Sequence, residues 1–193
     1  MELHQLDTYL KAKLSPKNYD RSTYTAQLML SVANKFDFDP KLGQLAGTLH
    51  LVSRQMSYEA MVSYVEAHDR NLLKRIPKEC LGIYHLTGPA SAWFAFEVLD
   101  ERSDDVFRGI RDHTFLYRDP SNLAKSLHIA GIIAAADQND PRTAVLVCDF
   151  LSGRMEKVLK TLNGRDVRSL EKTGANVRRL ARITNPDHRG NNS

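Results

Sequence analysis

The 193-residue sequence has few cysteines, with only Cys80 and Cys148, and no long hydrophobic run. Two cysteines are too few for a disulfide-built domain or a cysteine-ligated zinc finger, and burial in apolar surroundings is the expected role of both thiols. The longest apolar run, over residues 129–136, is too short to cross a bilayer, so no membrane partner is expected. The N-terminal residues include early acids and no continuous apolar core, which excludes a secretory signal. A reducing, cytoplasmic location is the resulting expectation.

Glycine-rich phosphate loops are also missing. The sequence has no Walker pattern, no G-x-G-x-x-G and no G-x-S-x-G. Its composition, 42% hydrophobic and 26% charged residues, is typical of a folded globular protein. The length fits one domain, which we place at residues 1–183, followed by a flexible tail at 184–193.

The positive charge is confined to the C-terminal part of the chain. The formal net charge is +4, but residues 154–182 alone carry +6 and residues 1–153 carry −2. Basic side chains that flank apolar positions are usually the solvated face of an amphipathic helix. No aromatic residue occurs after position 154, so this segment has no platform on which bases could stack. Nucleic acid is therefore not an expected partner.

The periodicity of apolar residues is helical throughout, and about eight to ten helices are expected. Asp39-Pro40, Pro120-Ser121 and Asp140-Pro141 are typical helix starts. The helix that begins at Asp140-Pro141 is expected to continue to Asn163-Gly164. Further expectations are a helix starting near Asp20, a loop containing Pro77, Gly82, Gly88 and Pro89, a buried helix over 90–99, and a last helix with Val167, Leu170, Val177 and Leu180.

Three polar residues in apolar contexts are candidates for chemistry. His50 follows the apolar stripe of one helix, and a hydrogen-bonded core histidine is the simpler explanation for it. His113 ends another helix, where the helix dipole favours an imidazole. Asp137 ends a third helix, where the dipole disfavours an acid. Asp137 is therefore either a solvated loop residue or a ligand.

Taken in order, five short segments resemble the YqeK-like branch of the HD-domain phosphohydrolases. That branch shows R-x-x-H, A-x-L-L-H-D-x-x-K, H-G-P-x-G-A, I-R-x-H-T and A-D-x-x-x-P-x-R in this order. The corresponding segments here are Arg21-Ser-Thr-Tyr24, Ala46-Gly-Thr-Leu-His50-Leu51-Val-Ser-Arg54, Thr87-Gly-Pro-Ala-Ser-Ala92, Ile110-Arg-Asp-His113-Thr114 and Ala136-Asp137-Gln-Asn-Asp-Pro141-Arg142.

The resemblance implies an all-α HD-domain bundle around one or two divalent metal ions, commonly iron. Members of the branch hydrolyse diadenosine tetraphosphate symmetrically to ADP. A divalent ion held by imidazoles and carboxylates lowers the pKa of a bound water, so that hydroxide can attack phosphorus. By this resemblance, Asp137 and His113 would be catalytic.

The departures from the family pattern fall on the metal ligands. Tyr24, Leu51 and Thr87 stand where the family has a histidine, an aspartate and a histidine. A phenol is a poor ligand for these ions at neutral pH, and leucine has no donor atom. His50, Asp137 and His113 remain as vestigial ligands, and His85 could replace the missing histidine only through a shifted loop. His50 and Asp137 are then free to hydrogen-bond each other or a neighbour.

We therefore expect a degenerate HD-domain protein with no cofactor, which binds a nucleotide, another phosphate-bearing molecule or a protein partner. The phosphate would be held by Arg21, Arg54, Thr114 and Arg142. Ion pairs with nearby acids are the simpler explanation for each arginine. The alternative is a working phosphohydrolase that uses His50, His85, His113 and Asp137 with a divalent ion such as iron or manganese.

Overall fold

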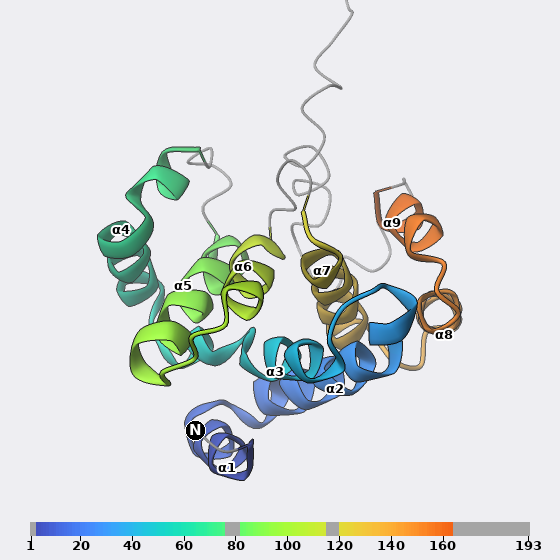
Figure 1. The fold of residues 1–193 in the computed structure, drawn as a ribbon, viewed down its shortest axis with the longest axis horizontal. Coiled ribbons are helices and arrows are strands. Elements are labelled where there is room, and N and C mark those ends of the chain that lie inside the picture. The colour runs from blue at the N-terminus through green and yellow to red at the C-terminus, as the bar shows by residue number, and fades with distance from the viewer. Residues whose placement is uncertain (1–2, 76–81, 115–119, 164–193) are drawn as a thin grey trace, which may run out of the picture.

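A computed structural model describes residues 3–75, 82–114 and 120–163, and within these ranges the regular structure is entirely helical (Figure 1). The elements are α1 (Leu3–Lys13), α2 (Pro16–Val32), η1 (Ala33–Lys35, a 3-10 helix), α3 (Pro40–Leu49), η2 (Val52–Gln55, a 3-10 helix), α4 (Tyr58–Arg75), α5 (Ile83–Val98), α6 (Asp104–Asp112), α7 (Asn122–Ala135), α8 (Pro141–Leu151) and α9 (Met155–Asn163). The predicted last helix, the domain boundary at 183 and the tail lie outside the described residues. None of the described helices is both long and apolar enough to cross a membrane.

Local capping determines where several helices begin. Asp39 accepts hydrogen bonds from the first amides of α3, and Ser121 and Asp140 do the same for α7 and α8, which confirms these predicted starts. The helix expected near Asp20 begins earlier, at Pro16, because Ser15 is its N-cap and accepts from the Asn18 amide.

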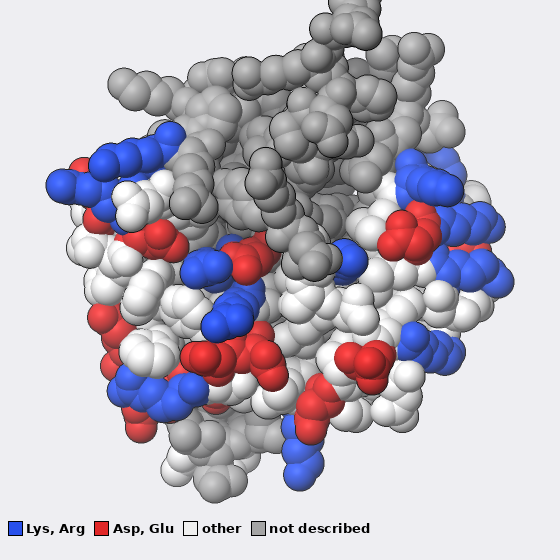
Figure 2. Space-filling view, turned by 45° about the horizontal axis from the view of Figure 1, so that its top comes forward, with Lys and Arg blue, Asp and Glu red and all other residues white. Residues whose placement is uncertain are grey.

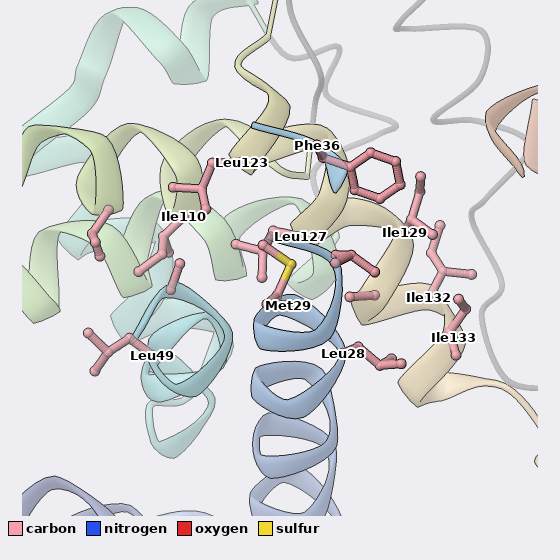
Figure 3. Close-up of a cluster of buried hydrophobic side chains, with 14 of the residues drawn as sticks. Leu28, Met29, Phe36, Leu49, Ile110, Leu123, Leu127, Ile129, Ile132 and Ile133 are labelled. Atoms are coloured by element: carbon pink, nitrogen blue, oxygen red, sulfur yellow. The ribbon is translucent and has the colours of Figure 1, made fainter. Parts of the chain in front are cut away.

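The core lies where α2 packs between α3 and α7 (Figure 3). Leu28 and Met29 of α2 belong to one buried cluster with Leu49 of α3 and the apolar residues of α7, and all are nearly inaccessible to solvent. Gly47 permits the close crossing of α2 and α3, because a Cβ at this position would lie 2.6 Å from the Cα of Ala26. This crossing brings the N-terminal half of α2 close to the end of α3.

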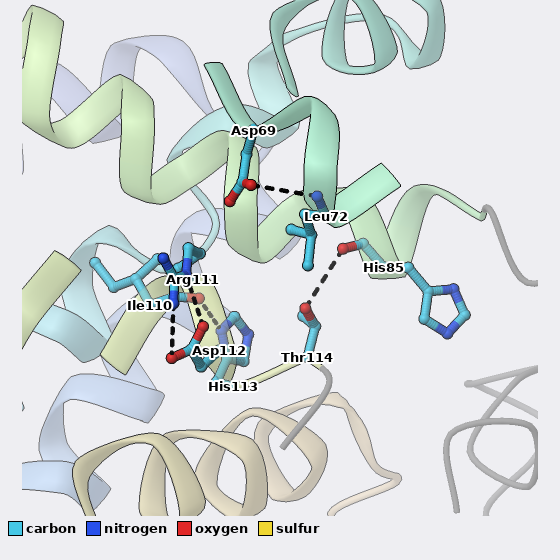
Figure 4. A network of polar contacts seen from close by, with 8 residues as sticks. All are labelled: Asp69, Leu72, His85, Ile110, Arg111, Asp112, His113 and Thr114. Atoms are coloured by element: carbon cyan, nitrogen blue, oxygen red, sulfur yellow. Dashed lines mark hydrogen bonds and ion pairs between the residues drawn. The ribbon is translucent and has the colours of Figure 1, made fainter. Parts of the chain in front are cut away.

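The expected loop around Gly88 and Pro89 is wrong, because α5 runs through both residues. A Cβ on Gly88 would lie 2.8 Å from the carbonyl oxygen of Ile110 and from Oγ1 of Thr114, so only glycine fits this contact with α6. Pro89 has no N–H for the carbonyl of His85, four residues earlier. Thr114 donates its hydroxyl to that carbonyl at 3.4 Å and so compensates for the missing helical bond (Figure 4).

The single helix expected from residue 140 to 163 is also wrong. It is interrupted after Leu151, and α9 begins at Met155. Gly153 has φ 81°, a left-handed conformation that glycine adopts without strain and that ends α8. Cys148 of α8 is exposed, which contradicts the expected burial, while Cys80 lies outside the described residues.

Helix α4 lies at the edge of the bundle and packs mainly against α5 (Figure 1). The two helices share a small core of their own, made by Met61 and Val65 of α4 with Leu86 and Ala90 of α5. This core is separate from the main one, so the attachment of α4 depends on few side chains.

Candidate functional site

A cluster of buried histidines and half-buried arginines lies where α2, α3, α6 and α7 meet. His50 ends α3 and His113 ends α6, and their rings lie edge to face with centroids 5.7 Å apart. Arg21, on α2, and Arg54, in η2, are close enough for their charges to act on His50. His128 of α7 contacts the backbone of His113. These five residues, His50, His113, His128, Arg21 and Arg54, are called the central cluster below.

Each histidine of the central cluster is held by a backbone carbonyl. Nδ1 of His50 lies 2.7 Å from the carbonyl oxygen of Gly47, and Nδ1 of His113 lies 2.6 Å from that of Ile110 (Figure 4). Nδ1 of His128 lies 2.8 Å from the carbonyl oxygen of His113. Because a carbonyl can only accept, Nδ1 donates in all three rings. In the neutral rings, Nε2 therefore carries the lone pair.

All three histidines are neutral at pH 7. Burial lowers the pKa of His50 to about 4, and the positive charges of Arg21 and Arg54 lower it further, against the bond to Gly47. Burial lowers the pKa of His113 to about 3, with a further contribution from His50. Burial also lowers the pKa of His128 to about 4. The cluster thus offers uncharged imidazoles beside permanent cations.

The two arginines of the cluster have no acidic partner among the described residues. Arg21 donates to the carbonyl oxygen of Ala135 at 3.4 Å, at the end of α7. Nη1 of Arg54 is buried and has no hydrogen-bond partner within the described part of the chain. Burial lowers the pKa of both guanidinium groups, although arginine remains charged in proteins. Such buried cations favour an anion as their partner.

Other arginines do form the expected ion pairs. Arg111 pairs with Asp112 at 2.7 Å, and Arg142 pairs with Asp140 at 2.5 Å. On the face shown in Figure 2, basic and acidic side chains are intermixed rather than gathered into patches of one sign. Arg21 and Arg54 therefore differ from the arginines of the surface.

Asp137 does not join the central cluster. It is exposed, and its carboxylate accepts the amide of Asn139 at 2.9 Å, as in a solvated turn after α7. Asp137 is not among the groups that perturb His50 or His113. Its observed bond is to a neighbour and not to His50.

His85 and Thr114 lie at the crossing of α5 and α6. The imidazole of His85 is buried and points away from His113, as Figure 4 shows. The hydroxyl of Thr114 donates a hydrogen bond to the backbone carbonyl of His85. Neither side chain is shown reaching the two central imidazoles.

The residues at the substituted family positions have structural contacts. Thr87 bonds the carbonyl of Ile83 at 2.6 Å, within α5. Tyr24 packs against the core and lines a separate cavity of about 570 Å³ between α2 and α8. Leu51 lies between α3 and η2 and has no donor atom.

The donor set of the central cluster does not fit a divalent metal ion. In the described ranges, no group of three or more His, Cys, Asp or Glu side chains is arranged to hold a metal. The charges that act on His50 are those of two arginines, which would repel a second cation. Among the described residues, no carboxylate acts on His50 or His113 to offset these charges.

His128 is the member of the cluster that the sequence did not reveal. It stands in an apolar helix with Leu127 and Ile129 on either side, a context typical of core packing. The residue that indicates which side of α7 faces the cluster is Gly131, one turn after His128. A Cβ there would lie 3.8 Å from Nε2 of His50, so this side of α7 faces the imidazoles.

The described residues form an all-α bundle, as predicted, and this fold is shared with a known protein. A solved structure described as a predicted HD superfamily hydrolase involved in NAD metabolism, from Clostridium acetobutylicum, is similar with a TM-score of 0.70 and 16% identity. The match covers 94% of this chain and 97% of that one, and it shows a shared fold. No family model and no curated protein matches the sequence.

Proposed function

We propose that this HD-fold protein binds a phosphate-bearing small molecule at the central cluster without a metal ion. The observation that carries the proposal is the pair Arg21 and Arg54, which lie beside the neutral His50 and form no ion pair with an acid in the described part of the chain. A phosphate group would supply the missing negative charge, and guanidinium is suited to bidentate contact with its oxygens.

Binding is better supported than hydrolysis. A histidine with a pKa of about 3 or 4 is a weak general base at neutral pH. Within the described ranges, no carboxylate is among the groups that act on His50 and His113, so neither ring has an acidic partner there to raise its basicity. The cluster therefore provides positive charge and orientation but no group to activate water.

Nucleotides are the first ligands to test, since the similar Clostridium structure is described as involved in NAD metabolism. The resemblance of the sequence to diadenosine tetraphosphate hydrolases points to the same class. The cluster itself recognises only the phosphate. The affinities of ADP, diadenosine tetraphosphate and NAD are therefore compared to identify the organic part of the ligand.

The test is calorimetric titration of the protein with these three compounds in the presence of EDTA. Wild-type protein is expected to bind at least one of them, and Arg54→Gln and Arg21→Gln are each expected to weaken binding by about 10- to 100-fold, the range for one charge-assisted hydrogen bond. Arg102→Gln is the matched control, because Arg102 is exposed and paired with Asp100.

Arg142→Gln is likewise expected to change the affinity only slightly, because the guanidinium of Arg142 is already paired with Asp140. Equal affinities of wild type, Arg21→Gln and Arg54→Gln would overturn the proposal. Binding that disappears in EDTA would also contradict it.

One observation favours the second candidate, a metal-dependent phosphohydrolase. The Nδ1–H bonds of His50 and His113 to backbone carbonyls are the contacts that hold metal-ligating histidines elsewhere. Incubation of the protein with diadenosine tetraphosphate and iron or manganese separates the two candidates. ADP release that is lost in Asp137→Ala would favour the enzyme, and absence of release with every ion would favour binding.

A further inference from the structure

A polar cluster of Tyr64, His68 and Glu97 joins α4 to α5, away from the central cluster. The carboxylate of Glu97, on α5, accepts the Tyr64 hydroxyl at 2.6 Å and lies 2.8 Å from Nε2 of His68. Tyr64 and His68 are one turn apart on α4, with ring centroids 4.5 Å apart. Trp93 of α5 covers the other side, at 5.3 Å from the His68 ring. These contacts supplement the small apolar core between the two helices.

Both ring nitrogens of His68 face acceptors. Nδ1 lies 2.7 Å from the carbonyl oxygen of Tyr64, and Nε2 faces the Glu97 carboxylate. A carbonyl and a carboxylate only accept, so each contact needs a proton on the ring nitrogen. A neutral imidazole has one N–H and satisfies one of the two acceptors. The observed arrangement is complete only when His68 carries both protons.

The cluster lies at the point where α4 is interrupted. Asp69, the residue after His68, has φ −141° and ψ 53°, which are not helical values. Its carboxylate accepts the amide of Leu72 at 3.3 Å and so starts the next helical segment. Residues 58–68 therefore form a separate segment, and His68 fastens its end to α5.

We propose that the protonation state of His68 controls how firmly α4 is attached to α5. With both ring nitrogens protonated, the contacts to Glu97 and to the Tyr64 carbonyl hold α4 in place. Loss of one proton leaves a lone pair facing an acceptor, and α4 then separates from α5 more often. Separation exposes the apolar residues that the two helices share, Met61, Val65, Leu86 and Ala90.

The charged groups around His68 favour this assignment. From α5, the carboxylate of Glu97 faces the ring. On α4, Glu66 pairs with Arg70 at 3.7 Å, and Asp69 follows His68. From α6, Arg111 is paired with Asp112 and also feels the charge of Asp69. Burial, together with the bond to Glu97, raises the pKa of Tyr64, so its hydroxyl stays protonated.

Hydrogen exchange of the full chain between pH 5.5 and 8.5 tests the proposal. The protection factors of α4 amides, corrected for intrinsic exchange and divided by those of the same amides in His68→Gln at the same pH, are expected to fall about three- to tenfold as the pH rises, the size for one partly exposed charged contact. Fluorescence of Trp93, the only tryptophan, reports protonation of the adjacent ring, and its midpoint should coincide with that of the exchange change.

Two variants complete the test. His68→Gln is the reference at each pH, because it lacks the titrating imidazole but keeps the central histidines, whose effect on global stability then cancels in the ratio. Glu66→Gln is the matched control, because it removes a charge from α4 without touching α5, and its ratio to His68→Gln should follow that of the wild type. A ratio of wild-type to His68→Gln protection that is constant with pH would overturn the proposal. A ratio that rises with pH would do the same.

Discussion

The imidazole of His113 lies edge to face with that of His50, and each ring is fixed by a carbonyl three residues earlier in its own chain segment. Two helix ends, of α3 and α6, thus place two uncharged rings at one point in the interior. Both rings are almost fully buried, so protonation of His50 would place a charge beside Arg21 and Arg54, and protonation of His113 would bury a charge beside His50.

Acidification is expected to destabilise the fold through the three central histidines. Their folded-state pKa values, about 4 for His50 and His128 and about 3 for His113, lie below the ordinary value of 6.5. The unfolded chain therefore binds more protons between these values, and stability falls as the pH drops below about 6.5. A histidine whose pKa is lowered as far as that of His128 decreases the free energy of unfolding by on the order of 3 kcal/mol once it is fully protonated.

Urea unfolding at pH 7.0, 6.0, 5.0 and 4.5 measures this loss. The variant His128→Gln should have a shallower dependence of unfolding free energy on pH, whatever its stability at pH 7. His4→Gln serves as the control, because His4 is exposed on α1. Identical slopes for wild type and His128→Gln would show that the buried rings do not titrate in this way.

Two glycines that face neighbouring helices should respond oppositely to alanine. In Gly47→Ala, the new methyl group would lie 2.6 Å from the Cα and 2.8 Å from the backbone nitrogen of Ala26, which cannot move without shifting α2. We expect the free energy of unfolding to fall by roughly 1–3 kcal/mol, the usual cost of overpacking.

In Gly131→Ala, the methyl group meets only His50 atoms, at 3.8 and 3.9 Å. Stability should then stay equal or rise by about 0.5–1 kcal/mol, as for alanine in a helix. Thermal and urea unfolding of the pair provides the comparison, and equal losses would contradict the close crossing of α2 and α3.

Thr114 and Pro89 should be coupled. The hydroxyl of Thr114 satisfies the His85 carbonyl that Pro89 leaves without a helical donor, so Thr114→Val should cost about 1–3 kcal/mol, as for a buried polar group left unpaired. Pro89→Ala restores a backbone N–H, and Thr114→Val should cost less in that background. A double-mutant cycle by urea unfolding measures the difference. Additive effects would mean that the carbonyl does not depend on Thr114, and a loss of nucleotide affinity in Thr114→Val would instead support the phosphate contact predicted from the sequence.

Features determined by nearby residues were predictable. Asp39, Ser121 and Asp140 cap the amides that follow them, so the starts of α3, α7 and α8 could be located from the sequence alone. The helical class followed from the apolar periodicity, and His50 and His113 were each selected through their motifs, without the edge-to-face contact that joins them. Arg21 and Arg54 were predicted from their motifs to hold a phosphate, and the structure places their charges close enough to act on His50.

Features determined by distant contacts were not predictable. Gly88 and Pro89 indicate a loop locally, and the helix there depends on Thr114, which follows His85 by 29 residues. The separation of Asp137 from His50 depends on how the turn after α7 folds. Which arginines lack an acid could not be known from sequence neighbours, since Asp20 precedes Arg21 and yet forms no ion pair with it in the described structure.

The three Nδ1–H bonds to carbonyls have a consequence for ligand choice. They leave Nε2 of the neutral rings as an acceptor, and Nε2 of His50 belongs to the ring beside Arg21 and Arg54, which can only donate. An oxyanion can satisfy both kinds of group only if it carries a proton that it can donate to a ring nitrogen. Hydrogen phosphate has such a proton, whereas sulfate at neutral pH has none. The polarity of these hydrogen bonds would therefore discriminate between two anions of nearly equal size and charge.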